Sequence, residues 1–351
     1  MSIIFFDGFD YYNGFGPGGR KWDQGSGASV TGGRFGGQAM QPNPYVFKTF
    51  SHSYRSLIVG WAMRVDAFQS GWFGTFQPPN HPFVIFSDGA NAQFSLWFNP
   101  VTFCIEFRTT TGENVNDQIL YQTTFPPPFT LWYYIEVKFD VPTGSFDIHI
   151  NGSSIATGSI QLQQTGNASV SRLGFKVTND GSGGVQWGMW LCDDLYVIDP
   201  TDATNNIDFL GECRIQTKYP DADGYQDDFL RSTGLVNANN VNTVPVTFND
   251  TGAYNYSGTV GAIDLYSIQN FTVSGTIFAV QENMSYKKDD VGNRKVAPIL
   301  RTAAANYIGS NFSCFSNYTY GNALWENNPA TGQPWDLTDL NLTEFGITVT
   351  A

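Results

Sequence analysis

The chain has 351 residues and a net charge of −13, and only 14% of its residues are charged while 16% are aromatic. This length exceeds one ordinary hydrophobic core, so two domains are expected. Because Lys and Arg form no clusters, the composition argues against binding to nucleic acid or to anionic membranes. No apolar run approaches the roughly 20 residues of a membrane-spanning helix, so no membrane insertion is expected.

Short apolar or alternating runs follow one another through the first 200 residues, and helical periodicity is absent from them. Turn-forming Gly, Pro, Asn and Asp separate these runs. The longest predicted strands are 57–68, 83–88, 92–98, 102–109, 118–123, 171–177 and 185–198. This pattern predicts an all-β protein whose residues 1–203 form an antiparallel jelly-roll β-sandwich.

The clearest strands lie within residues 131–152. Apolar Ile135 and Val137 alternate with polar Glu136 and Lys138, which predicts one packed face and one solvated face. A Pro-Thr-Gly turn and a second alternating run follow. An Asn-Gly dipeptide then ends this segment, and it predicts a tight hairpin turn into a third strand.

The sequence changes character after residue 203, where a polar stretch rich in Asp begins. Strands are predicted again beyond residue 232, with one short helix near 336–341. No repeat of fixed period is present. We therefore expect residues 204–351 to form a second, smaller β-sandwich.

Three aspartates at this boundary form a candidate calcium site: Asp221, Asp223 and Asp227. Oxygen-rich loops suit a hard cation such as Ca²⁺. The spacing lacks a third ligand before Gly224 and a closing Glu, so a polar turn between domains is the alternative. No other cofactor is predicted.

Aromatic side chains in loops are candidates for glycan binding, because sugar rings stack on exposed aromatic rings. The candidates are Trp72, Phe73 and Phe76 in the 69–82 loop, together with Tyr11 and Tyr12 near the N-terminus. In a chain so rich in aromatic residues, the alternative is that they belong to the core or contact a neighbouring subunit.

No catalytic constellation is found, and we expect the protein not to be an enzyme. A glycoside hydrolase needs a pair of carboxylates across the scissile bond. Glu136 and Asp140 share a strand face, but Lys138 lies between them. The three His residues are scattered, and neither a zinc motif nor a G-x-S-x-G motif occurs.

Several segments resemble known proteins. The run LWYYIEVKFDVPTGSFDIHING resembles the central hairpin of laminin-G-like, concanavalin-type jelly rolls, and WLCDDLYVID resembles their closing strand. The N-terminal runs FDGFD and RFGGQAM are similar to the first strands of such domains in tailed bacteriophages. Three later runs also resemble phage virion proteins: FLGECRIQTKYPDADG, SYKKDDVGNRKVAPILR and NPATGQPWDLTDLNLTEFGITVTA.

The resemblance implies a structural component of a tailed-phage virion, such as a tail, minor tail or tail-fibre protein. The implied partners are other virion proteins, further copies of the same chain, for example in a trimer, and bacterial surface glycan. The implied location is the virion, assembled in the host bacterial cytoplasm, since no signal peptide is recognised at the N-terminus. The alternatives are a capsid, head or collar decoration protein and, less favoured, a polysaccharide-degrading enzyme.

Overall fold

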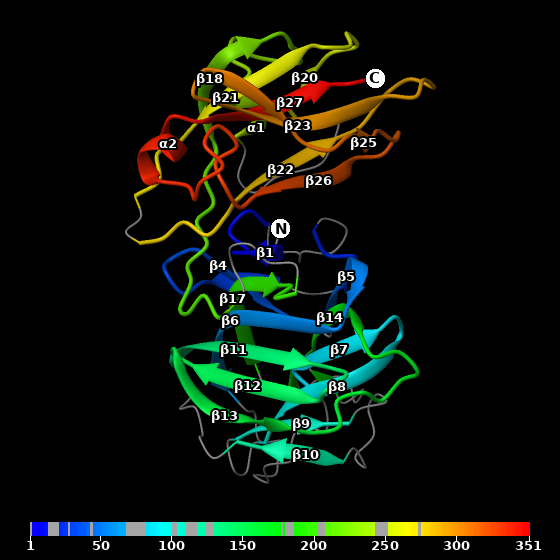
Figure 1. Ribbon diagram of the computed structural model, residues 1–351. Helices are drawn as coiled ribbons and strands as arrows, with labels where there is room; N and C mark the ends of the chain where they lie inside the picture. The colour runs from blue at the N-terminus through cyan, green and yellow to red at the C-terminus, as the bar shows by residue number, and fades with distance from the viewer. Residues whose placement is uncertain are drawn as a thin grey trace. The chain divides into compact units, whose positions relative to one another are not determined.

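The computed structural model describes most of the chain. The described residues are 2–12, 21–26, 29–42, 45–67, 82–99, 104–109, 118–123, 130–176, 178–179, 186–187, 189–201, 208–242, 252–272 and 275–351. They divide into two compact units, Met1–Ile215 and Gln216–Ala351. Both units are built almost entirely of antiparallel strands, which confirms the predicted all-β fold (Figure 1).

Two sheets make up most of the first unit. The first sheet contains β1 (Ile3–Asp7), β3 (Ser29–Gly32), β4 (Gln38–Gln41), β6 (Ser56–Ala67), β11 (Trp132–Asp140), β12 (Ser145–Ile150), β13 (Ser153–Ser159) and β17 (Met189–Ile198). The second contains β2 (Gln24–Ser26), β5 (Tyr45–Tyr54), β7 (Val84–Asp88), β8 (Asn91–Phe98), β9 (Ile105–Arg108), β10 (Ile119–Gln122) and β14 (Val170–Lys176). A separate short pair is formed by β15 (Thr178–Asn179) and β16 (Gln186–Trp187).

Aromatic side chains join the two sheets into a sandwich. The ring centroid of Phe139 in β11 lies 4.8 Å from that of Phe86 in β7 and 4.9 Å from that of Phe94 in β8. Phe146 of β12 contacts Phe107 of β9 in the same way, at 4.9 Å. Edge-to-face pairs of this kind add to the free energy gained from burial itself.

The hairpin predicted from residues 131–152 is present as β11 and β12, with β13 as the third strand. Asn151 and Gly152 both adopt positive φ, as a tight two-residue turn between twisted strands requires. The packed face also follows the prediction, because Ile135 and Val137 are buried.

The prediction that the opposite face of β11 is solvated is wrong. Glu136 on that face is fully buried, because residues 208–215 lie across it; we call this segment the 208–215 strap. One oxygen of the Glu136 carboxylate accepts hydrogen bonds from the Tyr196 hydroxyl and from the backbone N–H of Gly211. A buried carboxylate needs such donors to offset its lost hydration.

Further contacts hold the strap to the same face. Lys138 of β11 donates to the Asp208 carboxylate at 3.1 Å. The His149 ring of β12 stacks on Phe209 with 3.9 Å between centroids. The strap therefore belongs to the first unit, and the boundary lies at 215/216 rather than at the expected 203/204.

Two aspartates hold the turn between β3 and β4. The Asp10 carboxylate accepts the backbone N–H of Gln38, and the Asp193 carboxylate accepts the backbone N–H of Arg34, each at 2.8 Å. A Cβ atom added to Gly37 would lie 2.0 Å from the nearer Asp10 oxygen. A larger residue at this position would therefore displace the Asp10 carboxylate from the backbone N–H of Gln38.

Asp194, which follows Asp193 in the chain, interrupts β17. It has φ of +48°, and the pairing of β17 with β6 is irregular between Asp193 and Tyr196. Because of this bulge, the carboxylates of Asp193 and Asp194 can both form contacts on the same side of the chain. Asp194 accepts the backbone N–H of Ile215 at 2.7 Å and faces the Arg34 guanidinium at 3.5 Å.

The second unit is built around a sheet of six strands. These are β18 (Pro220–Asp227), β21 (Ile263–Ile268), β27 (Glu344–Val349), β23 (Lys295–Thr302), β24 (Ala305–Ile308) and β25 (Phe312–Ser313). Two short sheets accompany it: β19 (Leu230–Arg231) with β20 (Asn255–Tyr256), and β22 (Val280–Tyr286) with β26 (Thr319–Trp325). The described residues of this unit also form two short helices, α1 (Ala238–Val241) and α2 (Leu337–Asn341).

The helix expected near 336–341 is α2. The side chain of Asp336 precedes it and accepts the backbone N–H of Asp339 at 2.7 Å, as an N-cap does. Leu340 of α2 packs with Leu300, Trp335 and Phe345 in one core cluster. Among the described residues, neither helix has the length or apolar character needed to cross a bilayer.

We expect Gly37→Ala to lower the free energy of unfolding of the first unit by about 1–3 kcal/mol, because the new methyl group displaces the Asp10 carboxylate from Gln38. The matched control is Gly32→Ala, where an added Cβ has no neighbour within 4 Å. Denaturant titration monitored by tryptophan fluorescence measures both. Equal stabilities of the two variants would contradict the proposed close approach.

Burial and, to a smaller extent, the adjacent Asp194 carboxylate together raise the pKa of Asp193 to about 8. Burial likewise raises the pKa of Asp194, to about 6, although the N–H of Ile215 and the Arg34 guanidinium oppose this shift. The folded unit therefore binds more protons than the unfolded chain above about pH 4.

Because these folded pKa values are raised, their contribution to stability is present at the acidic end and is lost as pH rises to about 8. We expect the free energy of unfolding to decrease as the pH rises from about 5 to 8, by at most about 1.4 kcal/mol per pH unit for each proton. Asp193→Asn should flatten this slope, whereas the exposed-site control Asp290→Asn should not. A slope unchanged in Asp193→Asn would refute the assignment.

Candidate interaction surface

The aromatic residues proposed for glycan binding fall into two groups. Tyr11 and Tyr12 are buried: the Tyr11 hydroxyl donates to Tyr12 at 2.7 Å, and the Tyr12 hydroxyl donates to the Asp7 carboxylate at 2.6 Å. Trp22 donates to the same carboxylate at 2.9 Å. Tyr11 and Tyr12 are therefore not surface stacking residues, because their hydroxyls satisfy a buried charge instead.

The other group, Trp72, Phe73 and Phe76, lies outside the described residues.

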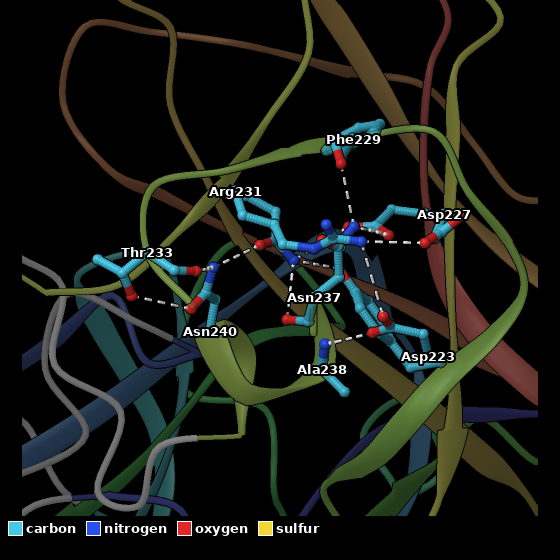
Figure 2. A network of polar contacts seen from close by, with 11 residues as sticks. Asp223, Asp227, Phe229, Arg231, Thr233, Asn237, Ala238 and Asn240 are labelled. Carbon is cyan, nitrogen blue, oxygen red and sulfur yellow. Dashed lines mark hydrogen bonds and ion pairs between the residues drawn. The ribbon is translucent and has the colours of Figure 1, made fainter. Parts of the chain in front are cut away.

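The three aspartates proposed for calcium lie on β18, and two of them contact an arginine. Arg231 approaches Asp227 at 3.1 Å and Asp223 at 3.9 Å (Figure 2). The other oxygen of Asp223 accepts the backbone N–H of Ala238 at 2.7 Å. Asp221 is exposed on the same strand. Arg231 thus supplies the positive charge that a metal ion would otherwise bring to Asp223 and Asp227.

In the part of the chain that the structure describes, no group of three or more His, Cys, Asp or Glu side chains is placed to hold one metal ion.

A different feature of this region is exposed. Leu230 of β19 and Tyr256 of β20 lie directly opposite each other, with 61% and 47% of their surfaces exposed. Tyr254 lies two residues before Tyr256, and the two rings are 6.0 Å apart. We call these three residues the β19–β20 surface. Large apolar side chains gathered at one exposed place are typical of interaction sites.

Buried amides hold this surface from beneath. Asn255 of β20 donates to the Asp264 carboxylate, to the Asn237 carbonyl and to the Tyr266 hydroxyl, each at 3.0 Å. The side-chain amide of Asn240 donates to the side-chain oxygen Oδ1 of Asn255 at 2.9 Å. The strand pair is therefore fixed in position although it contains only two residues on each side.

Asp264 is the centre of this network and is completely buried. Asn237 donates to one of its oxygens at 2.6 Å, and Tyr266 donates its hydroxyl to the other. Burial raises the pKa of Asp264, although hydrogen bonds from Tyr266, Asn237 and Asn255 oppose that shift. Burial raises the pKa of Tyr266 as well. These groups need one another, because each would leave the others unsatisfied if removed.

The sequence did not indicate this surface. The residues of the network come from separate segments, and β19 and β20 are too short to show a period. Leu230 follows Asp227, Asp228 and Phe229, so its position in the sequence places it in the polar stretch between the two domains. A signal was present in the tyrosines at 254 and 256, whose spacing places both rings on one side of a strand.

Comparisons with known proteins show remote likenesses only. No family model and no curated protein match the chain. Domain 4 of AbnA, an extracellular arabinanase from Geobacillus stearothermophilus solved with arabinotriose, is 14% identical over 56% of this chain and 92% of its own, with a TM-score of 0.37. The carbohydrate-binding module CBM66 from Bacillus subtilis is 12% identical over 53% of this chain and 96% of its own, with a TM-score of 0.29.

A sialidase is 12% identical over 48% of this chain, with a TM-score of 0.31, and the match spans only 16% of the sialidase. With TM-scores below 0.5, the likenesses carry no argument about what this chain binds or does.

We expect Asn255→Ala to release β20 from the network, because it removes the amide that joins Asp264, Asn237 and Tyr266. The loss should be about 1–3 kcal/mol, as for other buried hydrogen-bonding groups that lose a partner. Hydrogen exchange of the β19 and β20 amides measures it. The control Asn317→Ala alters an exposed amide, and equal exchange in both variants would contradict this role for Asn255.

Proposed function

We propose that the protein is a structural component of a tailed-phage virion, associated with the tail or a tail fibre, and that it acts by assembly. The observation that carries this proposal is the β19–β20 surface: Leu230, Tyr254 and Tyr256 are exposed yet held in one arrangement. The segments that resemble phage virion proteins, on both sides of the unit boundary, support the same assignment.

The chemistry of this surface suits a protein partner. Tyrosine is enriched at interfaces because its ring is large and rigid and its hydroxyl still finds a polar partner. A surface that is already ordered loses little conformational entropy on binding. The partner in the proposal is another virion protein or a second copy of this chain, which presents an apolar patch of its own.

The proposal includes no catalytic step. The buried carboxylates of the first unit are engaged within the fold: Asp7 accepts hydrogen bonds from Tyr12 and Trp22, and Glu136 accepts from Tyr196 and Gly211. Release of reducing sugar from the host polysaccharide by the purified protein would overturn this part of the proposal.

The test replaces the apolar side chains by Leu230→Ser together with Tyr256→Ser. A phage deleted for the protein is complemented with the wild-type or the variant chain, and purified particles are analysed by quantitative mass spectrometry. We expect the variant to be incorporated at least about 10-fold less, since loss of two anchoring side chains weakens binding by more than 1.4 kcal/mol.

The matched control is Leu342→Ser, which removes an equally exposed leucine outside this surface. Immunogold labelling of intact particles distinguishes the positions: label at the tail supports the proposal, and label over the head or collar supports the alternative, a decoration protein. Absence of the wild-type protein from purified particles would end both.

A further inference from the structure

Another exposed tyrosine in the C-terminal unit is placed by a bulge. The pairing of β18 with β21 is irregular between Asp223 and Asp227, and Tyr225 projects there with 73% of its surface exposed. Gly224 approaches β21 so closely that a Cβ would lie 2.8 Å from the backbone of Leu265. A bulge of this kind redirects a side chain out of the regular ladder.

Two residues from other strands fix Tyr225. Its backbone N–H donates to both oxygens of the Glu344 carboxylate, each at 3.0 Å. The Arg301 guanidinium lies over its ring, 3.9 Å from the centroid. Arg301 of β23 and Glu344 of β27 are direct neighbours in the sheet, on the face opposite the buried Leu300 and Phe345.

Arg301 is itself held on one side. Its Nη1 donates to the carbonyl of Ala304 at 3.0 Å and to the Asn306 side-chain oxygen at 3.3 Å. Ala303 and Ala304 form the turn between β23 and β24 with φ of +48° and +63°. Glycine or asparagine normally occupies such positions, so two alanines there are strained. Strain of this kind gathers at functional sites.

The opposite edge of Arg301, made by Nε and Nη2, has no hydrogen bond or ion pair with the described residues. Two other arginines use that same edge to bind a carboxylate within the chain: Arg108 binds Glu106, and Arg294 binds Asp290. Glu344, the neighbour of Arg301 in the sheet, instead accepts the backbone N–H of Tyr225. The Nε–Nη2 edge of Arg301 can therefore donate two parallel hydrogen bonds to a ligand beside the exposed ring of Tyr225.

We propose that Tyr225, Arg301 and Asn306 form a binding site for an acidic sugar. The ligand carboxylate would bind to the Nε–Nη2 edge of Arg301, which matches its planar geometry. The apolar face of a neighbouring pyranose ring of the same oligosaccharide would stack on the face of Tyr225 that Arg301 does not cover. The exposed amide of Asn306 is placed to hydrogen-bond sugar hydroxyls.

This site is separate from the β19–β20 surface in its residues and goes beyond the assembly role, so it can be tested on the purified chain without any particle. Titration calorimetry uses four probes: trigalacturonate, 3′-sialyllactose, neutral lactose and acetate. The first two distinguish a uronic acid from a nonulosonic acid. We expect one of them to bind at least about 10-fold more tightly than lactose and acetate.

Arg301→Gln should remove this preference, and Arg301→Lys should restore little of it because lysine lacks the planar edge. Tyr225→Leu, which keeps an apolar side chain, should weaken binding about 10-fold. The matched control is Arg294→Gln, whose guanidinium already pairs with Asp290 and whose loss should leave the affinity unchanged. Unfolding midpoints establish that each variant is folded.

Three results would overturn the proposal: no saturable binding of either acidic sugar at roughly 10 mM, binding no tighter than that of acetate, or an Arg301→Gln affinity equal to the wild type.

A separate check of the strained turn is Ala303→Asn with Ala304→Gly. This variant should unfold more slowly than the wild type while Arg301 still donates to the carbonyl of residue 304.

Discussion

The first unit depends on carboxylates that are buried together with their hydrogen-bond donors. Asp7, Asp193, Asp194 and Glu136 are buried and Asp10 is half-buried, in a chain with few charged residues. A buried carboxylate without donors is severely unfavourable, so each of these groups demands that particular backbone or ring N–H and O–H groups be present. The donors come from distant segments, including the turn after β3 and the 208–215 strap. Closure of the sandwich is therefore specified by polar contacts as well as by aromatic packing.

In the second unit, regular strands supply the framework and irregular backbone supplies the exposed side chains. The amide network beneath β20 and the bulge in β18 both hold tyrosines in fixed positions at the surface. Exposed aromatic side chains usually sample several rotamers, and the entropy lost on binding then weakens the complex. Here Asn255 and Glu344 fix the backbone that carries these tyrosines, which is the arrangement expected of sites built on rigid elements.

Alternation and turn chemistry were sufficient to predict what depends on neighbours in sequence. The β11–β12 hairpin and the capped helix α2 follow from such local rules. The prediction failed at Glu136 because the residues that cover it lie about 70 positions later, and no period records them. Tyr225 and Arg301 were not among the predicted site residues, since neither the bulge nor the contact between two distant strands leaves a local pattern.

The pairing of β1 with β17 determines when the first unit can finish folding. Ile3 leaves the ribosome long before its partner Ile198, and the strap that closes the outer face ends only at Ile215. Bringing these two strands together costs the entropy of closing the long chain segment between them before their contacts can form. Topologies with such distant pairings therefore fold slowly. During synthesis β1 therefore remains an unpaired apolar edge until nearly the whole unit has left the ribosome, and this interval is when the chain is most exposed to aggregation and chaperone binding.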